Sequence, residues 1–153
     1  MVNKDKKREG IIIKKTLKKG LGLFARKNFI KGEIVYSFKK GRTIRQPQIK
    51  NLTEDEKKHI NRLSKGRYEI IELPACRVNH SCDPNIVEIE RVAYAIKPIE
   101  KGEEITIDYR PISYIEIPFH CHCISKNCAK LIMGNYNLCY CGSELEYKDC
   151  HGK

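Results

Sequence analysis

Seven consecutive residues, Asn79-His80-Ser81-Cys82-Asp83-Pro84-Asn85, concentrate side chains that could do chemistry. The segment offers two amides, an imidazole, a hydroxyl and a thiol around a Pro-Asn turn, and apart from the proline it has almost nothing apolar to bury. Polar groups at this density are costly to bury unless each finds a hydrogen-bond partner. A bound ligand or a metal ion would supply such partners, so we expect a functional site here.

A second polar segment follows after sixteen residues, from Gly102 to Tyr109. It begins with a Lys101-Gly102 turn signal, alternates like a strand and ends on a tyrosine. A tyrosine at a strand end usually serves packing, so the residues alone leave packing and chemistry as alternatives for Tyr109.

Thiols at short spacing follow in the C-terminal part of the chain. Cys121, Cys123 and Cys128 place three of them within eight residues. Tetrahedral zinc needs four ligands, so a fourth must come from elsewhere. His120 or His122 could supply it, and free buried thiols are the alternative interpretation.

A second ligand set lies nearer the C-terminus. Cys139, Cys141, Cys150 and His151 have the Cys3His composition of a closed structural zinc site. Only Cys76 then remains of the eight cysteines. A single cysteine of this kind is usually a small buried hydrophobe.

The elements that must position these groups are mostly short strands. We predict strands at 11–13, 34–36, 68–73 and 86–96, and turns at Gly20-Leu21-Gly22 and Gly32. Thr53 and Glu56 form a capping box that predicts a helix of about ten residues, ending near 63–66. The pattern Ala25-x-Lys27-x-Phe29-x-Lys31-Gly32-Glu33 recurs 70 residues later as Ala95 to Glu103, which predicts two similar corners that each launch a strand.

Composition fits one domain with a small appendage, since the chain has 153 residues and 41% are apolar. Residues 1–50 carry 16 Lys and Arg against 3 Asp and Glu, whereas residues 51–153 carry 14 against 16. The basic half favours an anionic neighbour such as nucleic acid, with a solvated lysine-rich face as the alternative. No apolar run approaches the ~20 residues of a bilayer span. The charged start lacks a signal-peptide pattern, so eight cysteines indicate a reducing compartment.

Taken together, the motifs resemble those of the SET-domain protein lysine methyltransferases. The Asn79–Asn85 and Gly102–Tyr109 segments resemble the two signature motifs of that family, and Lys19-Gly20-Leu21-Gly22-Leu23-Phe24-Ala25 resembles its first motif. The resemblance covers roughly residues 11–133. It implies a mostly β fold of short curved sheets with a knot-like core, little helix and a zinc-organised tail. The implied regions are a disordered basic tail (1–9), a SET domain (10–118), a post-SET zinc segment (119–134) and a SEC-C-like motif (135–153).

The resemblance implies S-adenosylmethionine as cofactor and a lysine amine as methyl acceptor. Tyr109 would stand at the mouth of the methyl-transfer pore. Phe38 occupies a position where many members have a channel-lining tyrosine, and Tyr36 could substitute because residues two apart on a strand share a face. Ile107 replaces the usual Phe or Tyr, which favours a pocket that admits more than one methyl group. The residues implied to hold the cofactor are Gly20, Leu21, Gly22, Arg77, Asn79, His80 and Phe119.

Two zinc ions are implied as well. Post-SET segments of the family share their zinc with the cysteine of the Asn-His-Ser-Cys motif, so the first site would consist of Cys82, Cys121, Cys123 and Cys128. The second set resembles the small zinc motif at the C-terminus of the bacterial secretion motor ATPase. That motif binds an export chaperone in the motor, which implies a protein partner for Cys139, Cys141, Cys150 and His151.

We therefore expect an S-adenosylmethionine-dependent protein-lysine N-methyltransferase acting on a histone or another basic protein. One alternative is a catalytically silent SET scaffold that acts as a zinc-tailed protein- or nucleic-acid-binding module. Another is a zinc-dependent nucleic-acid binder using residues 1–50, which leaves the two central motifs unexplained. A cytoplasmic location in a prokaryotic or viral source is expected, or a nuclear one if the target is eukaryotic chromatin.

Overall fold

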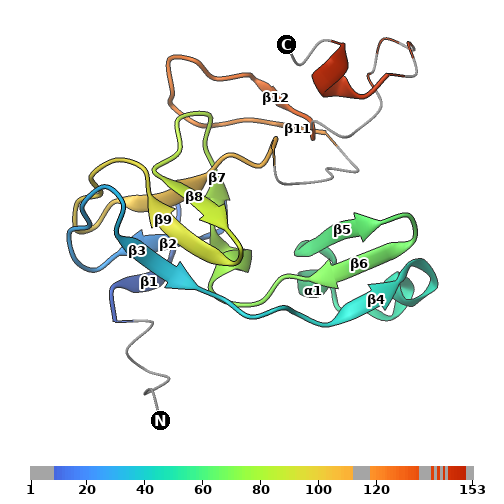
Figure 1. Cartoon of the computed structure of the whole chain (residues 1–153), viewed down its shortest axis with the longest axis horizontal. Helices are drawn as coiled ribbons and strands as arrows, with labels where there is room; N and C mark the ends of the chain where they lie inside the picture. Colours follow the sequence, from blue (N-terminus) through green and yellow to red (C-terminus); the bar gives the residue numbers. More distant parts are fainter. Residues whose placement is uncertain are drawn as a thin grey trace.

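The structure, a computed structural model, describes residues 9–111, 118–134, 139, 141, 143 and 145–150. Residues 1–8 of the predicted basic tail and His151 of the predicted second zinc site lie outside the described residues. Figure 1 shows a central body of strands, a separate lateral sheet beside it, and the C-terminal tail across one end. The lateral sheet is joined to the body by the two segments that enter and leave it.

The central sheet brings the two polar segments together. Its strand order is β1 (Ile11–Lys15), β2 (Leu21–Ala25), β10 (Glu104–Ile107) and β7 (Asn79–His80). β10 is antiparallel to β2 and parallel to β7. Of the predicted turn at residues 20–22, only Gly20, at φ 75°, lies in the turn, because the next two residues already pair with β1.

The heptapeptide continues along β10 beyond β7. The Ser81 N–H donates to the Ile107 carbonyl at 3.0 Å, and the Thr106 N–H donates to Asn85 Oδ1 at 2.9 Å. Asn85 is 2% exposed and also donates through Nδ2 to Glu103 and to the Glu104 carbonyl. The segment from Asn79 to Asn85 thus runs alongside β10.

The second sheet of the body has the order β3 (Ile34–Ser37), β9 (Val92–Ala95), β8 (Ile86–Ile89), all antiparallel. The prediction of one strand over 86–96 was wrong. Glu90 and Arg91 have positive φ values of 49° and 67° and turn the chain back on itself. Two successive residues at positive φ match the twist of a tight hairpin.

The lateral sheet has the order β4 (Thr43–Arg45), β6 (Arg67–Ile70), β5 (Ile60–Ser64), with 3-10 helix η2 (Gln46–Asn51) beside it. The capping box is confirmed, since Thr53 Oγ1 accepts the Glu56 N–H and Glu56 Oε2 accepts the Thr53 N–H. The predicted ten-residue helix was wrong. Helix α1 covers only Glu54–Lys57, because Ile60 already pairs with Ile70 in the sheet.

The two copies of the repeated sequence form matching corners that bond to each other. Phe29 and Ile99 exchange both backbone N–H···O bonds, at 2.9 and 3.0 Å. The Gly32 N–H donates to Ala95, and the Gly102 N–H donates to Ala25. Both glycines have positive φ, 86° and 93°, which strongly favours a residue without Cβ. The repeat is therefore a pair of interlocking corners, as well as the launch point of β3 and β10.

The apolar core lies under these corners and between the two sheets of the body. Its members are Ile11, Leu23, Ala25, Phe29, Val35, Tyr36, Val78, Ile86, Ala93, Ala95, Ile99, Ile105 and Ile107. A second, smaller core of Ile44, Leu52 and Tyr68 supports the lateral sheet. The lateral sheet therefore has its own core and meets the body at a separate junction.

The C-terminal tail begins with a two-stranded ribbon of β11 (Phe119–His120) and β12 (Leu131–Ile132). A short 3-10 turn, η4 (Tyr147–Asp149), follows. Within the part of the chain that is described, no helix has the length and apolar character to cross a bilayer.

Candidate functional site

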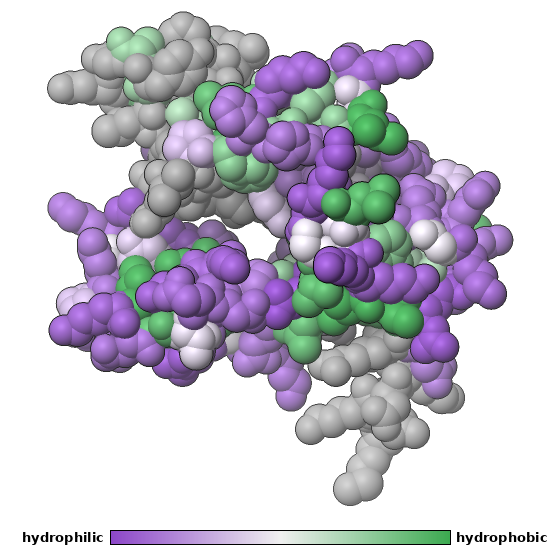
Figure 2. Space-filling view, turned by 180° about the vertical axis from the view of Figure 1, so that it is seen from behind, coloured by the Kyte–Doolittle hydropathy of each residue, from purple (hydrophilic) through white to green (hydrophobic). Residues whose placement is uncertain are grey.

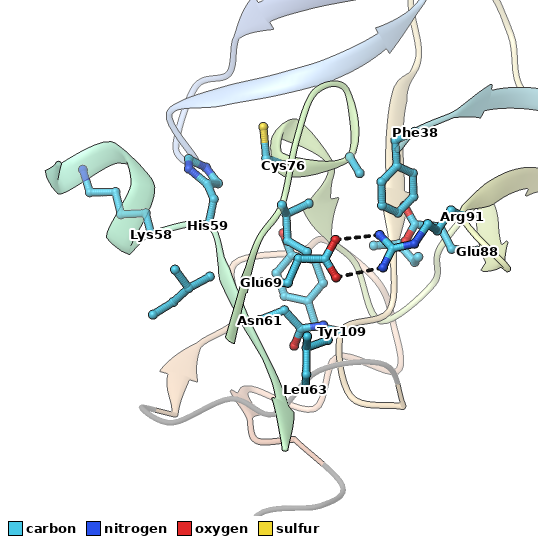
Figure 3. Close-up of a pocket in the computed structure, with 14 residues that line it drawn as sticks. Phe38, Lys58, His59, Asn61, Leu63, Glu69, Cys76, Glu88, Arg91 and Tyr109 are labelled. Atoms are coloured by element: carbon cyan, nitrogen blue, oxygen red, sulfur yellow. Dashed lines mark hydrogen bonds and ion pairs between the residues drawn. The ribbon is translucent and has the colours of Figure 1, made fainter. Parts of the chain in front are cut away.

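A cavity of about 430 Å³ lies where the lateral sheet meets the body, and we call it the lateral cavity. Figure 2 shows the surface hollowed between these two parts, and Figure 3 shows the side chains that line the hollow. These residues are Phe38, Lys58, His59, Ile60, Asn61, Leu63, Glu69, Ile71, Ala75, Cys76, Glu88, Arg91, Ile107 and Tyr109.

Tyr109 lines this cavity from just beyond the end of β10. Its hydroxyl donates to the Val78 carbonyl at 2.5 Å. Burial raises the pKa of Tyr109, so the phenol stays protonated at neutral pH. Phe38 and Ile107 contribute apolar surface to the same cavity. The site therefore offers a fixed, neutral hydroxyl next to apolar side chains, in a cavity that charged residues also line.

A smaller cavity of about 210 Å³ lies under the tail, and we call it the tail cavity. Its lining consists of Lys18, Lys19, Asn79, His80, Tyr109, Phe119, His120, Cys121 and His122. The rings of His80, Tyr109 and Phe119 form one cluster, with centroids 5.5 to 6.3 Å apart. Tyr109 belongs to both linings, so a single side chain borders the two cavities.

Asn79 is held at the wall of the tail cavity by backbone and side-chain partners. Its Nδ2 donates to the Leu21 carbonyl at 3.1 Å and to Glu104 Oε1 at 2.8 Å. Lys19 Nζ pairs with the other oxygen of Glu104 at 3.1 Å. A Cβ added at Gly22 would lie 2.8 Å from Asn79 Nδ2, closer than real contacts allow. The missing side chain at Gly22 thus leaves the space that the Asn79 amide occupies.

His80 is 5% exposed and joins the tyrosine to the thiols. Its Nδ1 accepts the Tyr109 N–H at 3.2 Å, so Nε2 carries the proton and faces Cys82 Sγ at 3.3 Å. Burial lowers the pKa of His80 to about 4, although the Asp108 carboxylate opposes this. The imidazole is therefore neutral at pH 7, and a neutral ring that donates to a thiol suits the outer shell of a metal site.

Cysteine sulfurs gather in two clusters. The ligand atoms of Cys82, Cys121, Cys123 and Cys128 all lie within 4.8 Å of one another. Those of Cys139, Cys141 and Cys150 do likewise. Four thiols at this separation have the donor set and spacing of a tetrahedral zinc site. The structure brings Cys82 to the first cluster across 39 residues of sequence, at 3.9 Å from Cys121.

Known families match most of the chain. The SET domain family matches residues 20–110, and the SEC-C motif matches residues 137–153. The chain belongs to the SET-domain family. The match covers both signature segments and the lateral sheet.

Curated relatives and a solved structure agree with this assignment. A histone-lysine N-methyltransferase of Yarrowia lipolytica, named as H3 lysine-36 specific, is 32% identical over 84% of this chain and 19% of its own length. Human histone-lysine N-methyltransferase 2B is 30% identical over 74% of this chain and 5% of its own. The SET-domain chain thus spans less than a fifth of either relative. The methyltransferase domain of human SETMAR, at 22% identity, has a TM-score of 0.62 and covers 81% of this chain and 58% of that domain, which shows a shared fold.

Five of the predicted catalytic and cofactor-binding residues of this SET-domain chain line neither cavity. The Arg77 guanidinium binds Asp55 at 2.8 and 3.1 Å and contacts His59, so it ties the loop before β7 to helix α1. Tyr36 is 2% exposed, and its hydroxyl donates to Glu88 at 2.5 Å. Tyr36 thus reaches the lateral cavity only through Glu88. Gly20, Leu21 and Gly22 do not line either cavity themselves, although the Leu21 carbonyl and the position of Gly22 border Asn79.

The sequence analysis missed two acidic residues of the lateral cavity. Glu69 is 2% exposed and forms a bidentate ion pair with Arg91 at 2.7 and 2.8 Å, drawn as dashed lines in Figure 3. Glu88 lies on β8, which was predicted only as part of a longer strand. An acidic residue between two strand-forming neighbours was the one available signal for each. Cys76, predicted to be buried, is partly exposed and lines the cavity.

Proposed function

We propose that this SET-domain chain is an S-adenosylmethionine-dependent protein-lysine N-methyltransferase. The observation that carries the proposal is Tyr109, whose side chain borders both the lateral and the tail cavity. A methyl donor in one cavity and a lysine in the other would meet at this residue. The names of the relatives, which are histone-lysine N-methyltransferases, favour the same reaction. Catalysis would then consist mainly of holding two partners in line.

The tail cavity fits the cofactor by its donor set. Asn79 offers an amide, Gly22 leaves space for that amide because it has no side chain, and Phe119 offers an aromatic face. When bound, S-adenosylmethionine supplies an electrophilic methyl group on a positively charged sulfur. The residues of the chain hold that methyl group beside Tyr109 and exclude water. His80 fixes the Tyr109 backbone by accepting its N–H. Arg77 acts indirectly in this proposal, by ordering the loop that leads to Asn79.

The lateral cavity fits a lysine side chain. The amine must be neutral to react, although its ordinary pKa is about 10.4. Phe38 and Ile107 offer the amine apolar surface, which disfavours the ammonium form. The Tyr109 hydroxyl gives the amine an uncharged partner. Ile107, smaller than an aromatic residue, leaves room for an amine that already carries methyl groups.

The thiol clusters are proposed to hold two zinc ions. Cys82, Cys121, Cys123 and Cys128 would hold the first, tying the tail to the His80 loop and so closing the tail cavity. Cys139, Cys141, Cys150 and His151 would hold the second, within the SEC-C motif. We propose that the SET domain covers 10–118, the post-SET segment 119–134 and the SEC-C-like unit 135–153. A protein partner at the last unit and a nucleic-acid contact through basic residues within 1–50 are further parts of the proposal.

Because the relatives are named histone-lysine methyltransferases, core histones are the first substrates to test, and a nuclear or chromatin-associated site of action follows if they are used. Zinc-loaded protein is incubated with methyl-labelled S-adenosylmethionine, core histones, nucleosomes and a lysate. Tyr109→Phe is compared with Tyr94→Phe, which removes the hydroxyl of a tyrosine that lines neither cavity. We expect label on lysine, a loss of about tenfold or more in Tyr109→Phe, and little change in Tyr94→Phe.

Two results would count against the proposal. Equal labelling by both variants would remove Tyr109 from the reaction. No label on any substrate, together with no binding of the cofactor in calorimetry, would contradict the enzyme itself. Cofactor binding without transfer would favour the catalytically silent scaffold.

A further inference from the structure

Glu88 has one carboxylate oxygen engaged and one available. It lies on β8, among the residues that line the lateral cavity. Its Oε1 accepts the Tyr36 hydroxyl at 2.5 Å. Among the described residues, no group donates a hydrogen bond to Oε2. A partly buried carboxylate oxygen without a donor costs free energy, and a ligand with an N–H would relieve that cost.

No cation of the cavity is directly paired with this carboxylate. Arg91, in the same cavity, is engaged through both terminal nitrogens by Glu69. The Arg91 side chain also lies against the Phe38 ring, at 5.6 Å. The Glu69–Arg91 pair is therefore self-contained, and Glu88 contributes a negative charge to the cavity that this pair does not cancel.

Glu88 also lies within electrostatic reach of Tyr109. After burial, the charge of Glu88 is the largest influence that raises the pKa of the Tyr109 hydroxyl. Burial in turn raises the pKa of Glu88, against the Tyr36 hydrogen bond and the charge of Arg91. Glu88 and Tyr109 line the same cavity, so a lysine amine that reaches Tyr109 enters a cavity that offers a hydrogen-bond acceptor as well as a hydroxyl.

We propose that Glu88 accepts an N–H of the substrate amine and thereby limits the product to dimethyllysine. This inference rests on the proposed methyltransferase function. The reactive, neutral amine carries two N–H groups when unmethylated, one when monomethylated and none when dimethylated. Only the first two forms can donate to Glu88 while their lone pair stays free to react. Transfer of a third methyl group would start from a dimethylated amine, which has no N–H to donate, and the Glu88 oxygen would be buried without a hydrogen-bond donor.

The limit that Glu88 sets on the number of methyl groups depends on how many N–H groups the amine has, and not on the volume of the cavity. Ile107 leaves space for a methylated amine, so volume alone would allow a third methyl group. The two residues therefore have separable effects. Ile107 leaves space for methyl groups on the amine, whereas Glu88 requires that the amine still carries an N–H.

Glu88→Gln tests the ability of residue 88 to accept a hydrogen bond separately from its packing, because the two side chains have nearly the same size. If Tyr36 donates to the amide oxygen, the amide presents N–H groups to the cavity, and these cannot accept an N–H. Glu88→Leu removes both polar atoms at similar volume and serves as a second variant. Glu100→Gln makes the same change at an exposed position that lines neither cavity, and is the matched control.

The assay uses peptides around the lysine labelled in the histone experiment, synthesised unmethylated, monomethylated and dimethylated. We measure kcat/KM for each and the final product by mass spectrometry, with cofactor binding and melting temperature for every variant. For the wild type we expect dimethyllysine as end product and a preference of about tenfold or more for the monomethyl over the dimethyl peptide, the effect of one hydrogen bond to a charged group. Both Glu88 variants should bring this ratio near one, and Glu100→Gln should keep it.

Each outcome separates the inference from the proposed function. A wild type that trimethylates readily, or Glu88 variants that lose activity on all peptides by the same factor, would overturn the role of Glu88 and leave the methyltransferase intact. A wild type that methylates none of the peptides would refute the proposed function, and the inference with it.

Discussion

Breaking the Glu69–Arg91 pair should loosen the junction between the lateral sheet and the body. Glu69 lies on β6 of the lateral sheet, whereas Arg91 is in the β8–β9 turn of the body. Glu69 also accepts the Gly41 N–H at 2.7 Å, at the segment that leads into the lateral sheet. One carboxylate thus ties together three segments, and Glu69→Gln is the smallest change that removes its charge.

The size of the effect follows from the exposure of the two partners. Removing one member of a fully buried ion pair costs about 3–5 kcal/mol. Here the Glu69 side chain is 3% exposed but the Arg91 side chain is 35% exposed, so water can solvate the guanidinium that remains. We therefore expect Glu69→Gln to lower the free energy of unfolding by about 2–3 kcal/mol. In a chain of this size, that corresponds to a fall of roughly 4–12 °C in the melting temperature.

The measurement is urea unfolding followed by circular dichroism, with Glu69→Gln, Arg91→Met and the double variant. The pair is coupled if the double variant costs clearly less than the sum of the single ones. Arg42→Met removes the exposed ion pair between Arg42, just before β4, and Glu56 of helix α1. The arginine is 59% exposed, so this change should cost less than about 1 kcal/mol. A loss below about 0.5 kcal/mol in Glu69→Gln, or additive single effects, would refute the reasoning.

The same pair predicts a dependence on pH. Burial alone would raise the pKa of Glu69, but the bonds from Arg91 and Gly41 hold it below its ordinary value. A carboxyl whose pKa is lowered in the folded state stabilises the protein above its unfolded pKa of about 4.3, and that contribution is lost as the pH falls through the lower folded value. The wild type should lose more stability than Glu69→Gln when the pH is lowered from 5 to 3. Parallel curves for the two proteins would show that Glu69 takes no part in acid unfolding.

Three further changes test other parts of the structure. Gly22→Ala should push the Asn79 amide from its two hydrogen bonds and weaken cofactor binding by roughly tenfold or more in calorimetry; unchanged affinity would argue against the tail cavity as the cofactor site. Cys123→Ser should lower the zinc content from about two to about one ion per chain by elemental analysis, and an unchanged content would exclude Cys123 as a ligand. Asn85→Ala removes the three hydrogen bonds of a buried side chain and should cost about 3 kcal/mol in urea unfolding, whereas a cost near zero would mean that water replaces them.

The main features of the site were predictable because they depend on residues that are neighbours in the sequence. The polar segment that begins at Asn79 and the turn at Gly102 each have residue types that local rules interpret. Their resemblance to one family then predicted that they share a site, and β7 and β10 do pair. Three thiols of the first cluster, those of Cys121, Cys123 and Cys128, were predictable from their spacing, whereas Cys82 followed only from the resemblance to the family.

The errors in the fold arose where tertiary contacts overrode local preference. Helix α1 has its predicted cap at Thr53, yet it ends at Lys57, because the following isoleucine gains more from pairing in the lateral sheet than from another turn of helix. The hairpin turn at Glu90 and Arg91 contains no Gly or Asn, the residue types that would have predicted positive φ values. The Arg91 side chain is instead fixed by an ion pair to the lateral sheet.

The acidic residues of the lateral cavity could not be predicted for a related reason. Glu69 and Arg91 are 22 residues apart, and Tyr36 and Glu88 are 52 apart. Sequence spacing carries information about partners on one helix or one strand, but not about partners brought together by separate sheets. Glu88 could only be recognised once the hydroxyl facing it was known.

The interlocking corners around Phe29 and Ile99 resemble, within one chain, the isologous interface of a two-fold dimer, since each presents the same donors and acceptors to the other. Neither corner has its partner until the other has been made. During synthesis the first must therefore wait for 70 further residues to leave the ribosome, and β2 cannot acquire its neighbour β10 before then. Contacts of such long range make for slow closure of the core. The part of the chain that ends the SET domain is consequently also the part that allows its beginning to fold.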